Sequence, residues 1–207
     1  MCSIIGSFSK DKIVELAELN AYRGQHSHSI SYYNPYRAEI VSAKRGLGPL
    51  NVDDIDIPEH LYCIVHQQAP TTGLKDDTIH PAQIGRHLLW HNGIVKADHI
   101  KKMQKDLFCS HEWDTYLILR QMKDYDTPKG IDGTFACLWY DEAGLTVFRN
   151  EISPLFYDKD FNLSSTKAEG FQSIPPNRMF IFDVVGKQLD FIDDFETVEN
   201  PYFGIDL

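Results

Sequence analysis

The sequence predicts an α+β domain, because strand-like apolar segments occur near both ends of the chain and helix-like segments lie between them. The last part of the chain contains short apolar segments separated by turn residues, at 134–140, 145–149, 155–158, 179–183 and 188–192. Two helix-like segments precede them, at 97–107 and 114–123. A length of 207 residues suits one domain with a substantial core.

The N-terminal segment is expected to form a short strand, at residues 2–8, followed by a helix. Ser9 is well placed to cap this helix, because its hydroxyl can accept a hydrogen bond from the first turn. Apolar side chains recur on one face of the helix, at Ile13, Leu16 and Leu19. This spacing predicts a helix that packs against the strand before it.

The middle of the chain predicts a series of shorter elements. They are a turn at 45–50, an acidic loop at 51–59, a strand at 61–66 and a long loop at 69–83. Residues 87–91 are expected to form a strand that ends at Asn92-Gly93, a dipeptide that favours a tight turn. The long loop contains two prolines and a glycine, and its length indicates a functional role.

The composition excludes several classes of partner. A net charge of −10 and a pI near 5.3 argue against a nucleic-acid or anionic membrane surface. No apolar run approaches the roughly 18 residues of a membrane span, and the N-terminus lacks the pattern of a secretory signal. We therefore expect a cytoplasmic protein with no nucleic-acid and no membrane partner.

The cysteines and histidines give no pattern of a metal site. The four cysteines, at positions 2, 63, 109 and 137, form no CxxC pair, so we expect reduced thiols and neither a disulfide framework nor a zinc site. The histidine spacing does not indicate a metal site either, and we expect no cofactor.

The second residue, Cys2, has the chemistry of an N-terminal nucleophile. If Met1 is removed, the thiol lies beside a free α-amine whose unperturbed pKa is roughly 7.7–8.0. That amine can take the thiol proton near neutral pH, so one residue supplies both nucleophile and general base. The alternative is a cysteine that is merely buried in a strand.

Further short motifs follow Cys2 in order along nearly the whole chain. They are Arg23-Gly24, His66 with Thr71 and Gly73, His80-Pro81, His91-Asn92-Gly93-Ile94, Trp113-Asp114-Thr115, Asp132-Gly133 and Pro154-Leu155. In this order they resemble the glutaminase domain of class II glutamine amidotransferases, the N-terminal-nucleophile family that includes asparagine synthetase and glucosamine-6-phosphate synthase. The similarity runs from Cys2 to about residue 185.

The resemblance implies a fold and an activity. The fold would be a four-layer αββα sandwich, in which two stacked antiparallel sheets carry helices on their outer faces. We expect the amidotransferase domain to cover residues 2–195, with an acidic tail at 196–207. Its reaction would hydrolyse the side-chain amide of glutamine through a cysteine thioester and release ammonia. Because the chain stops at Leu207, an ammonia acceptor is expected on a separate partner subunit, or the protein is a free-standing amidohydrolase.

The resemblance also implies the catalytic residues. Cys2 would attack the carboxamide, and the Asn92 side chain with the Gly93 backbone N–H would form the oxyanion hole. Asp114 would hold the α-ammonium group of glutamine. Each has a plainer alternative: Asn92-Gly93 is a hairpin turn, and Asp114 is a helix N-cap.

Four other residues are expected to bind the substrate: Arg23, Gln68, Thr71 and His80. Arg23 matches an arginine that orders the family's active site, although it could be a surface residue at a helix end. His80 matches a histidine in the loop over the glutamine pocket, although an isolated loop histidine is more often a surface group.

The chain departs from the family at Gln68. Other members have an arginine at this position, and that arginine binds the α-carboxylate of glutamine. A neutral amide cannot replace a guanidinium–carboxylate pair. Three alternatives remain open: another cation such as Arg23 or Arg86 supplies the charge, free glutamine binds weakly, or the substrate is an amide without a carboxylate there.

A competing hypothesis follows from the same departures, which also include His26 and Trp113. The protein would be a glutaminase-fold binding or regulatory protein that is non-catalytic or has altered specificity. The presence of Cys2 together with Asn92-Gly93 favours catalysis, because the nucleophile and the oxyanion residues match while the specificity residues differ.

Overall fold

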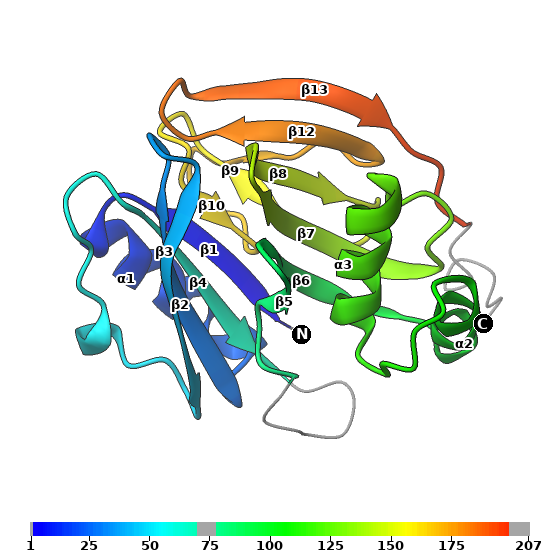
Figure 1. Ribbon diagram of the computed structural model, residues 1–207. Coiled ribbons are helices and arrows are strands. Elements are labelled where there is room, and N and C mark those ends of the chain that lie inside the picture. The colour runs from blue at the N-terminus through cyan, green and yellow to red at the C-terminus, as the bar shows by residue number, and fades with distance from the viewer. Residues whose placement is uncertain (1, 70–77, 199–207) are drawn as a thin grey trace, which may run out of the picture.

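Two antiparallel sheets face each other in the computed structural model, which describes residues 2–69 and 78–198 (Figure 1). The first sheet has the strand order β11-β9-β10-β1-β4-β2-β3. Its strands are β1 (Ser3–Ser7), β2 (Ser27–Asn34), β3 (Glu39–Leu47), β4 (Tyr62–Gln68), β9 (Phe156–Tyr157), β10 (Leu163–Ser164) and β11 (Gln172–Ser173).

The second sheet has the order β13-β12-β8-β7-β6-β5. Its strands are β5 (Ala82–Ile84), β6 (His87–Val95), β7 (Gly133–Asp141), β8 (Gly144–Arg149), β12 (Arg178–Asp183) and β13 (Gln188–Asp194). The α-helices are α1 (Lys10–Asn20), α2 (Ala97–Asp106) and α3 (Asp114–Tyr125), and short 3-10 turns lie at η1 (Ala21–Arg23) and η2 (Val52–Asp54).

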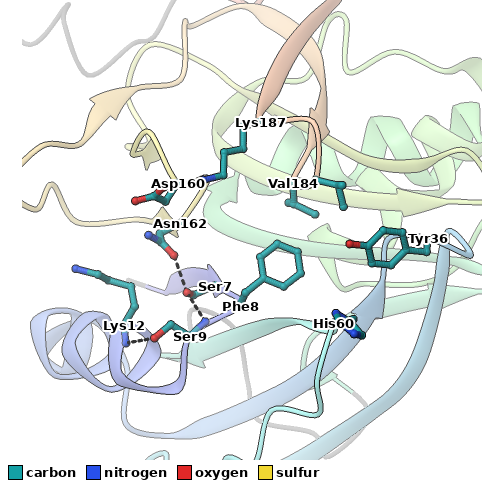
Figure 2. A pocket seen from close by; sticks show the side chains of 11 residues that line it. Ser7, Phe8, Ser9, Lys12, Tyr36, His60, Asp160, Asn162, Val184 and Lys187 are labelled. Atoms are coloured by element: carbon teal, nitrogen blue, oxygen red, sulfur yellow. Dashed lines mark hydrogen bonds and ion pairs between the residues drawn. The ribbon is translucent and has the colours of Figure 1, made fainter.

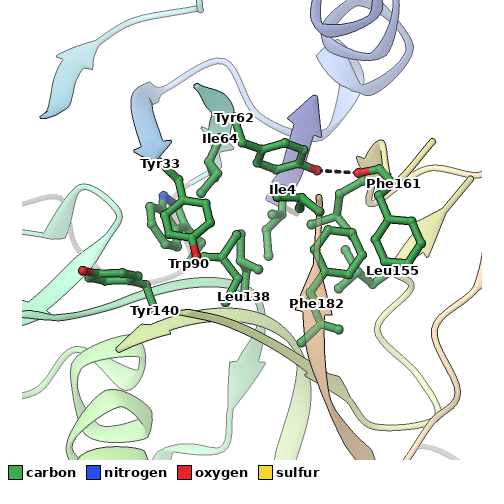
Figure 3. Close-up of a cluster of buried hydrophobic side chains, with 14 of the residues drawn as sticks. Ile4, Tyr33, Tyr62, Ile64, Trp90, Leu138, Tyr140, Leu155, Phe161 and Phe182 are labelled. Atoms are coloured by element: carbon green, nitrogen blue, oxygen red, sulfur yellow. Dashed lines mark hydrogen bonds between the residues drawn. The ribbon is translucent and has the colours of Figure 1, made fainter. Parts of the chain in front are cut away.

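Three apolar clusters hold these elements in four layers. The inner cluster fills the space between the sheets and includes Ile4, Ile64, Trp90, Leu138 and Phe182 (Figure 3). A second cluster packs α1 on the outer face of the first sheet, and a third packs α2 and α3 on the outer face of the second. The predicted α+β class and αββα layering are therefore confirmed.

Strand alternation explains how one strand serves two layers. In β1, Ile4 points to the inner cluster while its neighbour Ile5 points to the cluster under α1. Each side chain is fully buried. A strand covered on both faces reads as a continuous apolar run, which is how residues 2–8 read in the sequence.

The first helix begins where the sequence predicts, but it buries a different face. The Ser9 hydroxyl caps α1 by accepting a hydrogen bond from the Lys12 backbone N–H at 3.4 Å. Leu19, expected on the packed face, is instead 37% exposed, while Asn20 is fully buried. Asn20 is tolerated there because its side chain donates to the Leu16 carbonyl and to the Ser164 hydroxyl.

The sequence missed three strands and assigned one turn wrongly. Strands β2 and β3 were not predicted, and the end of β3 occupies part of the turn expected at 45–50. Strand β5 (82–84) was not predicted either, and it begins at the end of the loop expected at 69–83. Residues Asn92-Gly93 do not form a turn: β6 continues through them, and they pair with Ala136 and Phe135 of β7. Sheet pairing overrides the local turn preference of this dipeptide.

Among the residues that the structure describes, no helix is long and apolar enough to span a membrane.

Candidate active site around Cys2

Cys2 lies at the edge of the space between the sheets, immediately before β1. The register of β1 with β4 pairs Ser3 with Gln67 and Ile4 with His66, which places Cys2 beside Gln68. By strand alternation, the Cys2 side chain shares the inner face with Ile4. Its thiol is buried and donates to the carbonyl oxygen of Ala69 at 3.5 Å.

Burial also sets the protonation state of this thiol. Desolvation raises the pKa of Cys2 to about 11, and the negative charge of Asp114 acts in the same direction. The thiol is therefore neutral near pH 7. A buried neutral thiol is a poor nucleophile until a base removes its proton, so the site needs an adjacent proton acceptor.

Asn92 reaches the same space from the opposite sheet. It alternates with Trp90 along β6, so its side chain lies on the inner face. Strands β1 and β6 contact each other, and the His66–His91 hydrogen bond joins the two sheets one residue before Asn92. The Asn92 carboxamide is buried, yet it makes no hydrogen bond with any other described residue. Its polar atoms are not among the fully buried ones that lack a partner, so they reach solvent, and the two donor hydrogens are available to a ligand.

Gly93 occupies a position that only glycine fits. A Cβ atom there would collide with the carbonyl oxygen of Thr134, and the backbone φ of +157° is unfavourable for other residues. This close approach keeps β6 against β7 directly behind Asn92.

Asp114 begins α3 and is already hydrogen-bonded within the protein. Its carboxylate accepts from the backbone N–H of Thr115 at 2.7 Å and from that of Val95 at 3.2 Å. His91 Nδ1 lies 3.9 Å away. The N-cap position itself belongs to Trp113, so Asp114 is the first residue of the helix.

Both ends of the Gln68 side chain are engaged. Its Nε2 donates to the Thr78 carbonyl at 3.0 Å, and its Oε1 lies 3.0 Å from His80 Nδ1. Because Oε1 accepts, His80 carries its proton on Nδ1, and His80 Nε2 accepts from the Thr115 hydroxyl at 3.0 Å. Gln68 therefore orders the segment around His80.

Two further histidines, His66 and His91, complete a buried network that the sequence did not predict. His91 Nδ1 lies 3.1 Å from the Thr115 hydroxyl oxygen. His66 stacks on His80 with ring centroids 3.9 Å apart, and its Nε2 donates to the His91 carbonyl at 3.1 Å. The motif around His66 was the available signal, but residues 66, 80, 91 and 115 are too far apart in sequence to predict contact.

His80 is 3% exposed, so the surface alternative for it is wrong.

Arg23 is also buried: its Nε donates to the Thr166 hydroxyl at 2.9 Å. The adjacent Gly24 packs so closely on the backbone of Gln68 and Ala69 that a Cβ atom would not fit. Arg23-Gly24 thus adjoins the strand end beside Cys2. The expected site residue Thr71 lies outside the described residues.

Arg86 does not join the other site residues. It lies in the β5–β6 connection, at the opposite end of β6 from Asn92, and pairs with Glu142 at 2.9 Å on the surface. It is therefore not positioned to replace the missing arginine at Gln68.

In the described part of the chain, no group of three His, Cys, Asp or Glu side chains is arranged to hold a metal ion.

A separate pocket of about 640 Å³ lies at the far end of β1, around Ser7 and Phe8 (Figure 2). Two pairs of its polar side chains are bonded to each other: Lys187 with Asp160 at 2.7 Å, and Ser7 with Asn162 at 2.6 Å. This pocket is distinct from the site around Cys2.

Comparison with known proteins identifies the fold. No family model and no curated protein sequence matches the chain. The glutamine phosphoribosylpyrophosphate amidotransferase from B. subtilis, complexed with ADP and GMP, matches with TM-score 0.63 and 15% identity over 86% of this chain and 46% of its own. The allosteric regulatory enzyme of purine biosynthesis matches with TM-score 0.67 and 15% identity over 95% and 49%. The chain has the fold of a class II glutamine amidotransferase.

The predicted resemblance is thus confirmed for the architecture. The chain spans about half the length of the two matched structures. An identity of 15% shows the amidotransferase fold alone, so the roles of individual residues must be tested on this chain.

The buried histidines of this amidotransferase fold predict that acid destabilises the protein. Desolvation lowers the pKa of His66 to about 3 and lowers the pKa of His80 well below its usual value. The unfolded chain, with histidine pKa near 6.5, then binds more protons as pH falls below about 6.5. Each group lowers the free energy of unfolding by up to about 1.4 kcal/mol per pH unit in that range.

Urea denaturation at pH 7.5, 6 and 5 measures this loss. We expect His80→Gln to have a shallower pH dependence than the wild type, while His60→Gln, at an exposed position, keeps the wild-type slope. An equal slope in His80→Gln and wild type would contradict the assignment of a neutral buried His80.

Proposed function

We propose that the protein is a glutaminase-like amidohydrolase of the glutamine amidotransferase class, with Cys2 as nucleophile. The observation that carries the proposal is the position of Asn92, whose buried, unpartnered carboxamide lies on the inner face of β6 opposite the strand that begins after Cys2. A nucleophile with unused donors across a buried space is the arrangement that acyl transfer requires.

In the proposed mechanism, removal of Met1 frees the α-amine of Cys2, which takes the thiol proton. This internal base is needed because burial raises the pKa of the thiol to about 11, so that the thiol does not ionise by itself near pH 7. The sulfur attacks the substrate carboxamide, and the Asn92 side chain and Gly93 N–H stabilise the oxyanion. Ammonia leaves, and water then hydrolyses the thioester to a carboxylate. With Met1 attached, the nitrogen is an amide without a basic lone pair, and the protein should be inactive.

The substrate-binding residues are proposed to be Arg23, Gln68, Thr71, His80 and Asp114. Asp114 supplies the negative charge that an α-ammonium group needs. Gln68 acts through His80, since both ends of its amide are bonded within the protein. It therefore orders the pocket wall, and a substrate carboxylate must find its counter-charge elsewhere.

The domain is proposed to cover residues 2–195, with an acidic tail at 196–207, in a cytoplasmic protein. Released ammonia would pass to a separate acceptor subunit or be the final product. The second candidate is a binding or regulatory protein with this fold and no catalysis. The observation that favours it is the closed Gln68–His80–Thr115 network, which offers no free charge to glutamine.

Labelling with 6-diazo-5-oxo-norleucine, a glutamine analogue that alkylates such cysteines, separates the candidates. Intact mass should show loss of Met1 and one adduct, which peptide mapping places on Cys2. The Cys2→Ala variant should give no adduct. Loss of Met1 without an adduct would reject glutamine as the substrate and lead to a screen of other amides. Retained Met1 would reject the catalytic proposal.

A further inference from the structure

Three serines of β2 form a buried polar row on the inner face of the first sheet. Ser27, Ser29 and Ser31 alternate with Ile30 and Tyr32, which point to the cluster under α1. The exposure of the three serines is 1%, 0% and 0%. None of their hydroxyl groups has a hydrogen-bond partner among the described residues.

Two more buried groups without partners adjoin this row. Ser29 pairs across the strands with His66, and His66 Nδ1 has no partner among the described residues. Because His66 Nε2 donates to a carbonyl, Nδ1 carries a lone pair and can only accept. Ser31 pairs with Ile64. Trp90 belongs to the same inner cluster as Ile64, and its indole N–H also has no partner among the described residues (Figure 3).

This combination of groups indicates the chemistry of a ligand. These groups comprise a fixed donor at Trp90, a fixed acceptor at His66 and three serine hydroxyls that can do either. They carry no charge, because burial lowers the pKa of His66 to about 3 and keeps the ring neutral. Leaving five such groups dry would be costly, whereas small neutral molecules that both donate and accept, above all water, satisfy them.

The row also leads to the active site. Across the sheet, Cys2 lies beside Gln68, and Gln68 pairs with Ser27. Two residues further along β2, Ser29 pairs with His66 of β4 on one side and with Arg45 of the exposed edge strand β3 on the other. The polar row thus connects the solvent-exposed edge of the first sheet with the strand ends around Cys2.

We propose that Ser27, Ser29 and Ser31, with His66 and Trp90, bind a file of internal water molecules that supplies the hydrolytic water to the Cys2 thioester. The second half of this statement rests on the proposed function; the water site itself does not. In the hydrolysis step the water oxygen bonds to the acyl carbon and the carbon–sulfur bond breaks. One water proton ends on sulfur, and the products are the free carboxylic acid and the Cys2 thiol.

Matched substitutions of Ser29 test the water site without substrate. Valine and threonine have the same shape, so Ser29→Val removes the hydroxyl while Ser29→Thr keeps it. A high-resolution crystal structure should show ordered waters against the serine row in the wild type and in Ser29→Thr. Fewer waters are expected in Ser29→Val. A row without water in the wild type would overturn the proposal.

A stability measurement covers the case in which valine disturbs folding. If water satisfies the hydroxyl, Ser29→Ala removes a hydrogen bond and should lower the urea midpoint of unfolding. If the row is dry, the same change removes a buried unsatisfied group and should leave the midpoint equal or higher. The direction of the shift therefore decides between a hydrated and a dry row.

Kinetics test the role of the water. With glutamine, Ser29→Val should accumulate the thioester, detected by intact mass, and turn over at least about 10-fold more slowly than Ser29→Thr, a loss of about 1.4 kcal/mol. Added hydroxylamine, which can enter from the substrate side, should restore turnover by forming the hydroxamate. Equal hydrolysis in both variants would overturn the role of the water file. Absence of both ammonia release and thioester in the wild type and in Ser29→Val would instead overturn the proposed function and leave the crystallographic result standing.

Discussion

Replacing Cys2 with alanine should abolish ammonia release from the amide substrate, with kcat lowered by at least about 10⁴-fold. In the proposed mechanism the sulfur forms the covalent intermediate, and no other described thiol is placed to take over this role. Cys63 and Cys137 are fully buried in the clusters under the helices, and Cys109 lies beside α2 on the other sheet. Purified protein assayed for ammonia, with circular dichroism to show that the fold is kept, measures this effect.

The matched control is Cys109→Ala, which removes a partly exposed thiol and should retain wild-type activity. A second arm adds a short N-terminal extension before Cys2, which leaves the thiol but converts its amine to an amide. That protein should also be inactive, because the base is lost. Full activity in either Cys2→Ala or the extended protein would contradict the N-terminal nucleophile mechanism.

Apolar runs in the sequence predicted central strands of the fold, whereas the four layers were implied by the resemblance to the family. Residues 2–8 and 61–66 are apolar runs, and both became central strands of the first sheet. Strand β2 was not predicted, because serines occupy its inner face at alternate positions and the segment therefore has a polar pattern. The alternating serines therefore explain both why the strand was not predicted and why its inner face is polar.

The site was predictable only where neighbours in sequence act together. Cys2 and the pair Asn92-Gly93 were singled out, but the dipeptide also favours a turn, and only pairing with β7 shows that it lies within a strand. The role of Gln68 could not be read from the sequence. Its amide is held by Thr78 and His80, and such a contact depends on how the chain returns to β4 after the loop.

The contacts of Gln68 change how its replacement of the family's arginine is interpreted. A glutamine in place of arginine, taken alone, indicates a weakened pocket. In the structure it belongs to a buried network that includes His80 and Thr115 and that reaches Asp114 through the backbone N–H of Thr115. A replacement that is built into such a network fits an altered substrate better than the loss of function.

Asn92→Ala should lower kcat by about 10²–10³-fold, equivalent to roughly 2.7–4 kcal/mol of transition-state stabilisation. KM should change little, because the oxyanion forms only after attack begins. The free energy of unfolding should stay within about 0.5 kcal/mol of the wild type or rise, because the Asn92 carboxamide makes no hydrogen bond with another described residue. Steady-state kinetics and urea denaturation of the same preparation measure both effects.

Asn150 provides the contrasting control. It is equally buried, but its side chain accepts from the Phe135 N–H at 3.2 Å and donates to the Gly133 carbonyl at 2.8 Å. Asn150→Ala should therefore cost about 1–3 kcal/mol of stability while the folded fraction keeps its kcat. The two variants therefore separate catalysis from structure: Asn150 makes its hydrogen bonds in the folded protein, whereas the Asn92 donors are proposed to act in the transition state. Unchanged kcat in Asn92→Ala would contradict the oxyanion role and favour the binding-protein alternative.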